Sequence, residues 1–409
     1  MTDLMWPGDQ RAGLHMTDAS LWQAMLRVES AWLHALAETG LVPASAADCD
    51  LSALVTDDDQ ETVAAGADTG GNPVIGLVDL LRRRAPRPIR SCIHCGLTSQ
   101  DVLDSALMLV LRDALAQLGG ELSRQITALS ELATRHHLTP MVGRTLTQHA
   151  VPTSFGVKVA GWLHGLCHAA ERTSRLVVPV QIGGAAGTLA ATTELATLLQ
   201  GAGDAAEVAM CLAALTAHAL GLAYRPPWHT SRGTVTEIGD ALVSCTDAWG
   251  RIASDVVTLA RPEIGELAEP SAPGRGGSST MPDKHNPVLS VLIRRAAMTG
   301  PPLAATLHTA AVLSNDERPD GAWHAEWDTL RILARRTLVA ASHATELLDG
   351  LQVGTDRMAA NLDGAAVLGE QHSIAALTHQ APSPTYFGAA EQLITAALDR
   401  AHRALKDLA

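Results

Sequence analysis

Aromatic residues are scarce in this chain of 409 residues, which contains only two Phe and two Tyr besides eight Trp. The interior must therefore be built mainly from Ala, Leu and Val, and that composition favours closely packed helices. Charged residues are also few, at 18%, whereas apolar residues make up 47%. A chain of this length and composition can form two or three domains around a large core.

Neither a surplus of basic residues nor a long apolar run is present. The net charge of −13 leaves no basic surface for nucleic acid, so a small anionic substrate would have to be attracted by local positive groups. The N-terminus lacks a basic segment followed by an apolar one, and no run approaches eighteen apolar residues. We therefore expect a cytoplasmic protein that binds neither nucleic acid nor membrane.

Cysteines are few and scattered through apolar or small-residue surroundings. Cys92 and Cys95 have the spacing of half a zinc site, but no second Cys pair follows at ligand spacing. Free buried thiols are the usual form of such cysteines. We expect no metal and no cofactor.

A glycine-rich segment, 271–287, runs directly into an apolar, helix-like stretch. Its three glycines tolerate backbone angles closed to other residues, so the segment can swing, as a loop that closes over a substrate must. Two hydroxyls, a cation and an amide follow the glycines and could exchange a proton and hold a carboxylate. These residues are Ser278, Ser279, Lys284 and Asn286.

Apolar residues recur at helical spacing over most of the chain. The first such pattern follows Thr17 or Asp18, either of which is a plausible N-cap, and ends at Gly40. Pro301 and Pro302 should break or kink the fourth of five later helices. Those helices are expected at 152–175, 190–222, 233–260, 287–314 and 323–349.

The loop 271–287 resembles the G-S-S-x-M-P-x-K-x-N-P signature of the fumarase/aspartase superfamily, which contains fumarase, aspartase, argininosuccinate and adenylosuccinate lyases, and 3-carboxy-cis,cis-muconate cycloisomerase. Eight specified positions within eleven residues carry the resemblance. A simple Gly/Ser linker would need no Met-Pro, Lys and Asn at fixed offsets.

Two further segments resemble substrate-binding blocks of this superfamily. Thr98 and Ser99 stand near a helix N-terminus, where free amides, the helix dipole and two hydroxyls make a natural carboxylate site. The same residues also form an ordinary capping sequence. With His94 they resemble the H-x-G-x-T-S-x-D block, which implies that His94 contacts substrate and that Thr98 and Ser99 bind a carboxylate. Asn72 matches, more loosely, the family loop that carries an Asn near the substrate.

The third block, 139–153, resembles G-R-T-H-x-Q-x-A-x-P. Leu146 stands where fumarases and adenylosuccinate lyases have a His that is usually given the general-acid or relay role. The cycloisomerase branch also lacks that His and carries one three residues later, as His149 does here. The resemblance thus points to that branch, and it implies that Thr145 and Gln148 hold substrate oxygens.

By this resemblance the chemistry is proton transfer at a carbon next to a carboxylate, with loss or gain of a group at the neighbouring carbon. Ser278 would carry the proton, and Lys284 and Asn286 would hold the carboxylate whose α-carbon reacts. The implied catalytic residues are Ser278, His149, His94 and Lys284. The implied substrate-binding residues are Asn72, Thr98, Ser99, Thr145, Gln148, Ser279, Met281 and Asn286.

The resemblance implies an all-α fold in which five long helices per subunit form a twenty-helix tetramer core, with each active site shared by three subunits. The segments 233–260 and 323–349 carry wide apolar faces that a monomer would leave exposed. We expect an N-terminal helical domain over 1–96, a central bundle with the catalytic loop over 97–349, and a shortened C-terminal helical domain over 350–409.

Three functions remain open. The first is a 3-carboxy-cis,cis-muconate cycloisomerase or a close relative that forms a lactone. The second is a β-elimination lyase that releases fumarate from a substituted succinate, such as nitrosuccinate, adenylosuccinate or argininosuccinate. The cycloisomerase branch typically reads M-P-H-K-R-N-P. Here Asp283 replaces the His and His285 replaces the Arg of that pattern, so a tricarboxylate would meet less positive charge. The third is a crystallin-like structural protein, against which the intact Ser278, Lys284 and Asn286 argue.

Overall fold

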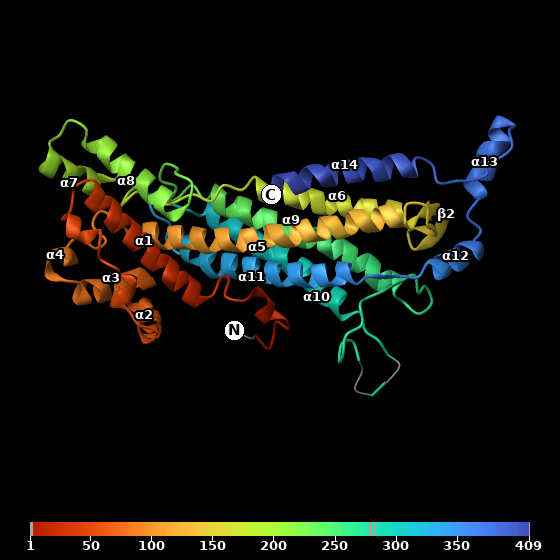
Figure 1. Ribbon diagram of the computed structural model, residues 1–409, viewed down its shortest axis with the longest axis horizontal. Coiled ribbons are helices and arrows are strands. Elements are labelled where there is room, and N and C mark those ends of the chain that lie inside the picture. Colours follow the sequence, from red (N-terminus) through yellow and green to blue (C-terminus); the bar gives the residue numbers. More distant parts are fainter. Residues whose placement is uncertain (1–2, 278–279, 282–283, 409) are drawn as a thin grey trace.

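The computed structural model describes residues 3–277, 280–281 and 284–408. Five long helices lie side by side along the longest axis and form the body of the molecule (Figure 1). They are α5 (Ser99–Arg135), α6 (Phe155–Ser174), α9 (Gly233–Leu259), α10 (Val288–Val312) and α11 (Ala322–Asp349). The mostly helical fold expected from the sequence is therefore confirmed, and four of these helices begin and end close to the predicted residues.

Small residues allow the bundle helices to approach closely. A side chain in place of Gly250 on α9 would come within 2.5 Å of Ala297 on α10. α11 contacts α5, α9 and α10, and no residue from 330 to 348 is exposed. The expectation that segments 233–260 and 323–349 present wide apolar faces to solvent is thus wrong, because neighbouring helices of the same chain bury those faces.

The N-terminal segment starts beside the middle of α11 and then runs to one end of the molecule (Figure 1). η1 (Asp9–Ala12) precedes α1 (Asp18–Glu38), and Thr17 is confirmed as the N-cap because its hydroxyl accepts from the Ser20 amide at 3.2 Å. The remaining elements here are η2 (Ala44–Ala46), η3 (Ser52–Leu54), α2 (Asp57–Gly70), α3 (Pro73–Arg84), α4 (Arg87–Arg90), α7 (Ala190–Gln200) and α8 (Ala205–Leu220).

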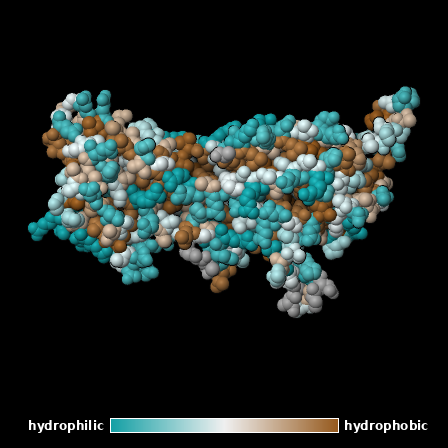
Figure 2. Space-filling view, in the orientation of Figure 1, coloured by the Kyte–Doolittle hydropathy of each residue, from teal (hydrophilic) through white to brown (hydrophobic). Residues whose placement is uncertain are grey.

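The segment predicted as one helix over 190–222 is two helices. Gly201 adopts φ 95° and ends α7, and Asp204 stands at the start of α8. Within the described residues no single helix is long and apolar enough to cross a membrane; α7 and α8 reach that length and composition only together, bent by 120°. Apolar side chains gather on their surface (Figure 2), among them Leu198, Leu199 and Met210.

A β-hairpin interrupts the helices after α5. β1 (Pro140–Thr145) pairs antiparallel with β2 (Gln148–Ser154), and α6 begins at Phe155 rather than at 152. A second small sheet joins β3 (Leu267–Ala268) to β4 (Gln352–Val353). The sequence did not predict either pair of strands.

Two prolines lie inside α10 without breaking it. Pro301 and Pro302 cannot donate backbone hydrogen bonds, so we expected a break or a kink. α10 nevertheless runs unbroken from Val288 to Val312. Both prolines are exposed, and Met298 one turn earlier is 66% exposed, so water can reach the carbonyl that Pro302 leaves unpaired.

The chain ends with α12 (Thr355–Asp363), α13 (Gly369–Thr378) and α14 (Ala390–Leu408). α14 returns along α6 (Figure 1), where the Arg400 guanidinium donates to both carboxylate oxygens of Glu171 at 2.8 Å. This last helix covers part of the outer surface of the bundle.

Candidate active site

The first predicted block lies at the N-terminus of α5. Thr98 is the N-cap of α5, and its amide donates to the Asp101 carboxylate at 3.0 Å. The Thr98 hydroxyl accepts a hydrogen bond from Arg318, which stands in the turn before α11. A cation, a hydroxyl and the positive end of a 37-residue helix therefore meet here. Such a place favours a carboxylate ligand.

Asn72 lies beside this block at the start of α3. Its side-chain oxygen accepts from the Val74 amide at 3.1 Å, so Asn72 serves as the N-cap of α3. His324 on α11 contacts the carbonyl of the preceding Gly71, with its Nε2 at 3.0 Å from that oxygen. His324 thus ties the Asn72 turn to the same end of α11 that carries Arg318.

His94 occupies a strained turn between α4 and α5. Its φ of 61° lies in the left-handed region, which costs a non-glycine residue roughly 1 to 2 kcal/mol. Three contacts hold the turn in place. Arg82 donates to the Ile93 carbonyl at 2.8 Å, Glu29 contacts His94 Nδ1 at 2.6 Å, and the Trp32 indole donates to the Cys95 carbonyl at 2.7 Å.

A buried charged cluster supports the block from behind. The Arg232 guanidinium donates to Asp104 at 2.7 Å and, on its other side, to Glu326. All three side chains are at most 2% exposed. Burial raises the pKa of Glu326, although the ion pair with Arg232 opposes the effect. Asp101 accepts from the amides of Gly183 and Gly184, both at 2.9 Å, so α5 is tied to the 181–188 loop as well.

The second block forms the tip of the β1–β2 hairpin. Thr145 and Gln148 pair across a two-residue turn, Leu146-Thr147, in which both residues have positive φ. Such a turn usually contains Asn-Gly, so two ordinary side chains here make a strained tip. Thr145, Gln148 and His149 are exposed, and Leu146 is 96% exposed.

The hairpin is anchored through a buried ion pair. Arg144 donates to both oxygens of Glu266, at 2.7 and 3.0 Å, and Glu266 is fully buried. Arg144 is therefore occupied and holds the hairpin rather than presenting its charge to solvent. Lys158 on α6 lies in the same charged environment, and burial lowers its pKa despite the nearby Asp255 carboxylate.

The third block is the 271–287 loop, of which Ser278 and Ser279 lie outside the described residues. Asn286 closes the loop: its backbone and side-chain nitrogens donate to the Gly276 carbonyl at 2.9 and 3.0 Å. Gly276 has φ 70°, and a side chain there would come within 2.5 Å of the Asn286 carbonyl oxygen. Only glycine fits this approach.

An open cavity of about 790 Å³ lies beside this loop. Met281, Lys284 and His285 line it from the loop, and Arg261 lines it from the end of α9. Glu269 accepts from the amides of Leu289 and Ser290 at 3.0 and 2.6 Å and so caps α10 directly after the loop. Because Lys284 and Arg261 are cations, the cavity wall is positively charged, as binding of a carboxylate requires.

The first block lies toward one end of the bundle, whereas the second and third blocks lie toward the other end (Figure 1). The first block precedes Ser99 and the second follows Arg135, so they lie beyond opposite ends of α5. A helix of 37 residues is roughly 55 Å long. One chain therefore does not bring His94 and His149 together, and the predicted residues form a single site only if different chains contribute them.

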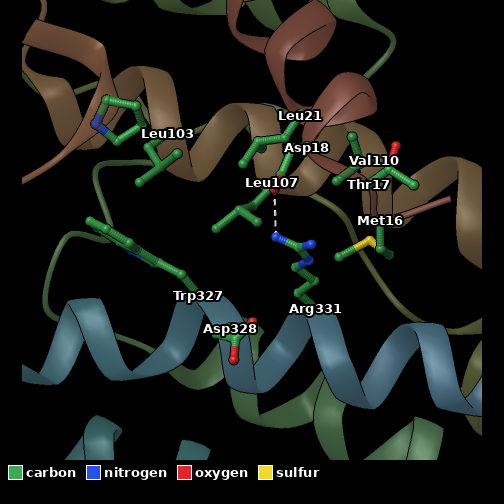
Figure 3. A pocket seen from close by; sticks show the side chains of 11 residues that line it. Met16, Thr17, Asp18, Leu21, Leu103, Leu107, Val110, Trp327, Asp328 and Arg331 are labelled. Carbon is green, nitrogen blue, oxygen red and sulfur yellow. Dashed lines mark hydrogen bonds and ion pairs between the residues drawn. The ribbon is translucent and has the colours of Figure 1, made fainter. Parts of the chain in front are cut away.

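A smaller cavity of about 210 Å³ lies between α1, α5 and α11 (Figure 3). Its walls are mainly apolar, and the Arg331 guanidinium meets the Asp18 carboxylate across it at 2.5 Å. It contains none of the predicted site residues. Because its one cation is already paired, it offers little to a polycarboxylate.

The described residues contain no group of three or more His, Cys, Asp or Glu that could hold a metal ion.

A family model described as lyase matches residues 13–299, which is most of the chain. The chain belongs to the fumarase/aspartase superfamily. It is accordingly an enzyme related to lyases and cycloisomerases.

Relatives of this chain include both a lyase and cycloisomerases. Nitrosuccinate lyase of Streptomyces davaonensis is 45% identical over 365 residues, covering 87% of this chain and 76% of the relative. The 3-carboxy-cis,cis-muconate cycloisomerase of Pseudomonas aeruginosa is 40% identical over 369 residues, covering 88% and 77%. The solved 3-carboxy-cis,cis-muconate lactonizing enzyme of Pseudomonas putida superposes with a TM-score of 0.82 at 32% identity, covering 93% of this chain and 94% of that one.

Glu29 and Arg318 contact the candidate site residues His94 and Thr98, and the sequence did not reveal either contact. A signal for Glu29 exists, because it is a charged residue on the apolar face of α1, next to Val28 and one turn before Trp32 and Leu33. Arg318 lies in an irregular turn, and nothing in its local sequence indicates that it contacts Thr98. Both contacts depend on segments that are distant in the chain.

Proposed function

We propose that this superfamily member acts on a small polycarboxylate, transferring a proton at the carbon α to a carboxylate while a group adds or leaves at the β carbon. The dianionic intermediate of such a reaction needs fixed donors in a protected site. The observation that carries the proposal is the hydrogen bond from Arg318 to the Thr98 hydroxyl at the N-terminus of α5. Lys284 and Arg261 supply further positive charge at the loop.

The first candidate reaction is formation of a lactone from 3-carboxy-cis,cis-muconate. A substrate carboxylate oxygen adds to a carbon of the double bond, and the neighbouring carbon takes a proton, so no group leaves. Support comes from His149 at the position typical of the cycloisomerase branch and from the cycloisomerase relatives in sequence and structure. Ser278 would supply the proton, and Lys284 with Asn286 would hold the adjacent carboxylate.

The second candidate is elimination of nitrite from nitrosuccinate. Here a base removes the proton from the α carbon, the C–N bond breaks, and nitrite departs with the bonding electrons to leave fumarate. Nitrite needs no protonation, which agrees with the apolar Leu146 at the hairpin tip. Asp283 and His285 carry less positive charge than the His and Arg typical of the cycloisomerase branch, which also favours a substrate with fewer carboxylates. The 45% identical nitrosuccinate lyase supports the same reaction.

We further propose that the active form is a homotetramer in which the blocks around His94, His149 and Ser278 come from three subunits. The separation of the first two blocks along α5 supports this arrangement, since neither block alone holds all the groups that the reaction needs. The exposed hairpin tip supports it as well, because a strained, fully exposed turn of ordinary residues is otherwise hard to explain.

The surface of α10 supports self-association. Val291, Met298, Ala305 and Val312 follow one another at intervals of seven residues, and all four are exposed. Met298 and Val312 are 66% and 79% exposed. Apolar residues at this spacing form one stripe along a helix, and such a stripe typically packs against another helix. A second copy of α10 is the simplest partner.

Purified protein incubated with 3-carboxymuconate and, separately, with nitrosuccinate tests the assignment. Loss of ultraviolet absorbance without nitrite would support the cycloisomerase, whereas nitrite release with formation of fumarate would support the lyase. Lys284→Met is the matched control, and we expect it to lower kcat and kcat/KM together. Turnover of neither substrate by the wild-type protein would refute both candidates.

A further inference from the structure

We propose that Glu29 fixes His94 with a hydrogen on Nε2, so that His94 donates to a substrate oxygen and does not act as a base. This inference rests on the proposed function, because it places His94 in the substrate site. The starting observation is the 2.6 Å contact between His94 Nδ1 and Glu29 Oε1. The contact joins α1 to the strained turn before α5, 65 residues later in the chain.

Glu29 is a carboxyl group in an unusual place. Its side chain is fully buried, and its second oxygen, Oε2, has no hydrogen-bond partner among the described residues. A buried carboxylate is strongly unfavourable unless an opposite charge and hydrogen bonds compensate it. His94 supplies the only contact found for this carboxyl group in the described part of the chain, so the charge state of the pair is determined by the two groups together.

Three arrangements of protons are possible for the pair. If both groups are neutral, the Glu29 hydroxyl donates to Nδ1, and the hydrogen of the imidazole lies on Nε2. If both are charged, the imidazolium donates from Nδ1 and carries a second hydrogen on Nε2. In the third arrangement a neutral His94 donates from Nδ1 to an anionic Glu29, which leaves Nε2 free to accept.

Only the third arrangement would make His94 a base, and burial disfavours it relative to the neutral pair. It leaves a full negative charge in the interior opposite a neutral ring, with Oε2 unpaired. In both remaining arrangements Nε2 carries a hydrogen. The other groups around the turn are the Arg82 guanidinium on the Ile93 carbonyl and the thiols of Cys92 and Cys95, and none of them accepts a proton from His94.

The turn presents this donor outward. The His94 side chain is 16% exposed, whereas its partner Glu29 has no exposure, so the part of the ring that reaches the surface is the part directed away from Glu29. Glu29 and Trp32, nearly one helical turn apart on α1, hold the consecutive residues His94 and Cys95. The left-handed φ of His94 is therefore maintained from outside the turn, as expected where a strained residue has a function.

Paired substitutions at His94 test the role of the ring. A glutamine amide can donate a hydrogen bond but cannot take up a proton. We therefore expect His94→Gln to keep kcat within about tenfold of the wild type and His94→Ala to lose about a hundredfold or more, since one fixed donor contributes on that scale. Equal and complete loss in both variants would overturn the donor role, and full activity in His94→Ala would overturn the proposal together with the placement of His94 in the site.

A double-mutant cycle tests the action of Glu29 through His94. We expect Glu29→Leu to reduce kcat/KM at least tenfold in the wild-type background and to have no further effect in His94→Ala. Additive effects would overturn the proposal, because Glu29 would then act independently of the ring. Glu38→Leu, an exposed position on the same helix, is the matched control and should be unchanged. Thermal unfolding of each variant shows whether the chain still folds.

The test does not depend on which reaction the enzyme performs. If the wild type turns over neither candidate substrate, the same variants are compared by calorimetric titration with fumarate and succinate as dicarboxylate probes. Weaker binding in His94→Ala and Glu29→Leu, with binding retained in His94→Gln, would support the proposal even though the proposed reaction had failed. Identical affinities in all variants would overturn the proposal.

Discussion

Thr98 and His149 lie beyond opposite ends of the same helix, α5, with 37 helical residues between them. Both belong to segments that resemble substrate-binding blocks of the superfamily. A site that uses both must therefore draw them from different chains.

Replacing Ser278 with alanine should abolish turnover with either candidate substrate. We expect kcat to fall by about a hundredfold or more, as is common when the group that transfers a proton is removed. Steady-state kinetics checks the effect, and circular dichroism confirms that the helices remain. A variant that kept more than about a tenth of the wild-type kcat would show that Ser278 is not the proton carrier.

Mixing two inactive variants should restore activity if sites are shared between chains. His149→Ala and Ser278→Ala are unfolded together and reassembled at equal amounts. Random assembly gives about a quarter of the sites neither lesion, so we expect up to a quarter of the wild-type activity to return. Each variant reassembled alone is the control. A tetramer that regains nothing would place both blocks on one chain.

A charge on the α10 stripe should prevent assembly. Met298→Asp places a carboxylate in the middle of the proposed contact, where burial without a partner is strongly unfavourable. We expect a smaller particle in light scattering and loss of activity, with the helical content retained. Leu377→Asp on α13, an apolar residue that is also well exposed but lies away from the bundle, should leave both properties unchanged. An active monomer in Met298→Asp would contradict the shared-site proposal.

Introducing the His and Arg that are typical of the cycloisomerase branch at positions 283 and 285 should change the choice of substrate. The double variant Asp283→His, His285→Arg adds positive charge beside Lys284. We expect the ratio of kcat/KM for 3-carboxymuconate to that for nitrosuccinate to rise about tenfold or more, because a third carboxylate gains a partner. Parallel assays of both substrates measure the ratio. An unchanged ratio would show that these two positions do not set specificity.

His343 should make stability depend on pH in the acidic range. Burial, followed by Arg11 and Arg295, lowers its pKa from 6.5 to about 4. The unfolded chain thus binds a proton between pH 6.5 and 4 that the folded chain does not, so stability present above pH 6.5 is lost as the pH falls. The pKa difference corresponds to about 3 kcal/mol of unfolding free energy.

Denaturant unfolding at pH 7, 5.5 and 4.5 measures this contribution. His343→Leu should lose less stability over that range than the wild type, since the buried group no longer titrates. His34→Leu, an exposed position, is the control and should follow the wild-type curve. Parallel curves for wild type and His343→Leu would contradict the prediction.

Local patterns in the sequence were sufficient for much of the fold. Thr17 as a helix cap and the ends of α9, α10 and α11 could be predicted, because they depend on neighbouring residues and helical periodicity. The Leu146-Thr147 turn could not, since its residues do not favour positive φ. The helix break at Gly201 could have been predicted, because Gly201 and Gly203 stand one residue apart and glycine disfavours a continuous helix.

Contacts between distant segments were beyond prediction from one sequence. The Glu29–His94 and Arg318–Thr98 pairs join residues that are 65 and 220 positions apart. The burial of α11 is of the same kind, because its apolar face could have met another chain as easily as α5 and α9. The sequence could indicate that such a face needs a partner but could not say which one.

The number of residues in α5 determines how the blocks beyond its two ends are oriented relative to each other. Each residue in a helix turns the chain by about 100° and advances it by about 1.5 Å. Inserting or deleting one residue anywhere in the 37 would therefore rotate the hairpin block relative to the Thr98 block and disturb every site that uses either. Substitutions that preserve the helix therefore leave this geometry intact, whereas a change in the number of its residues does not.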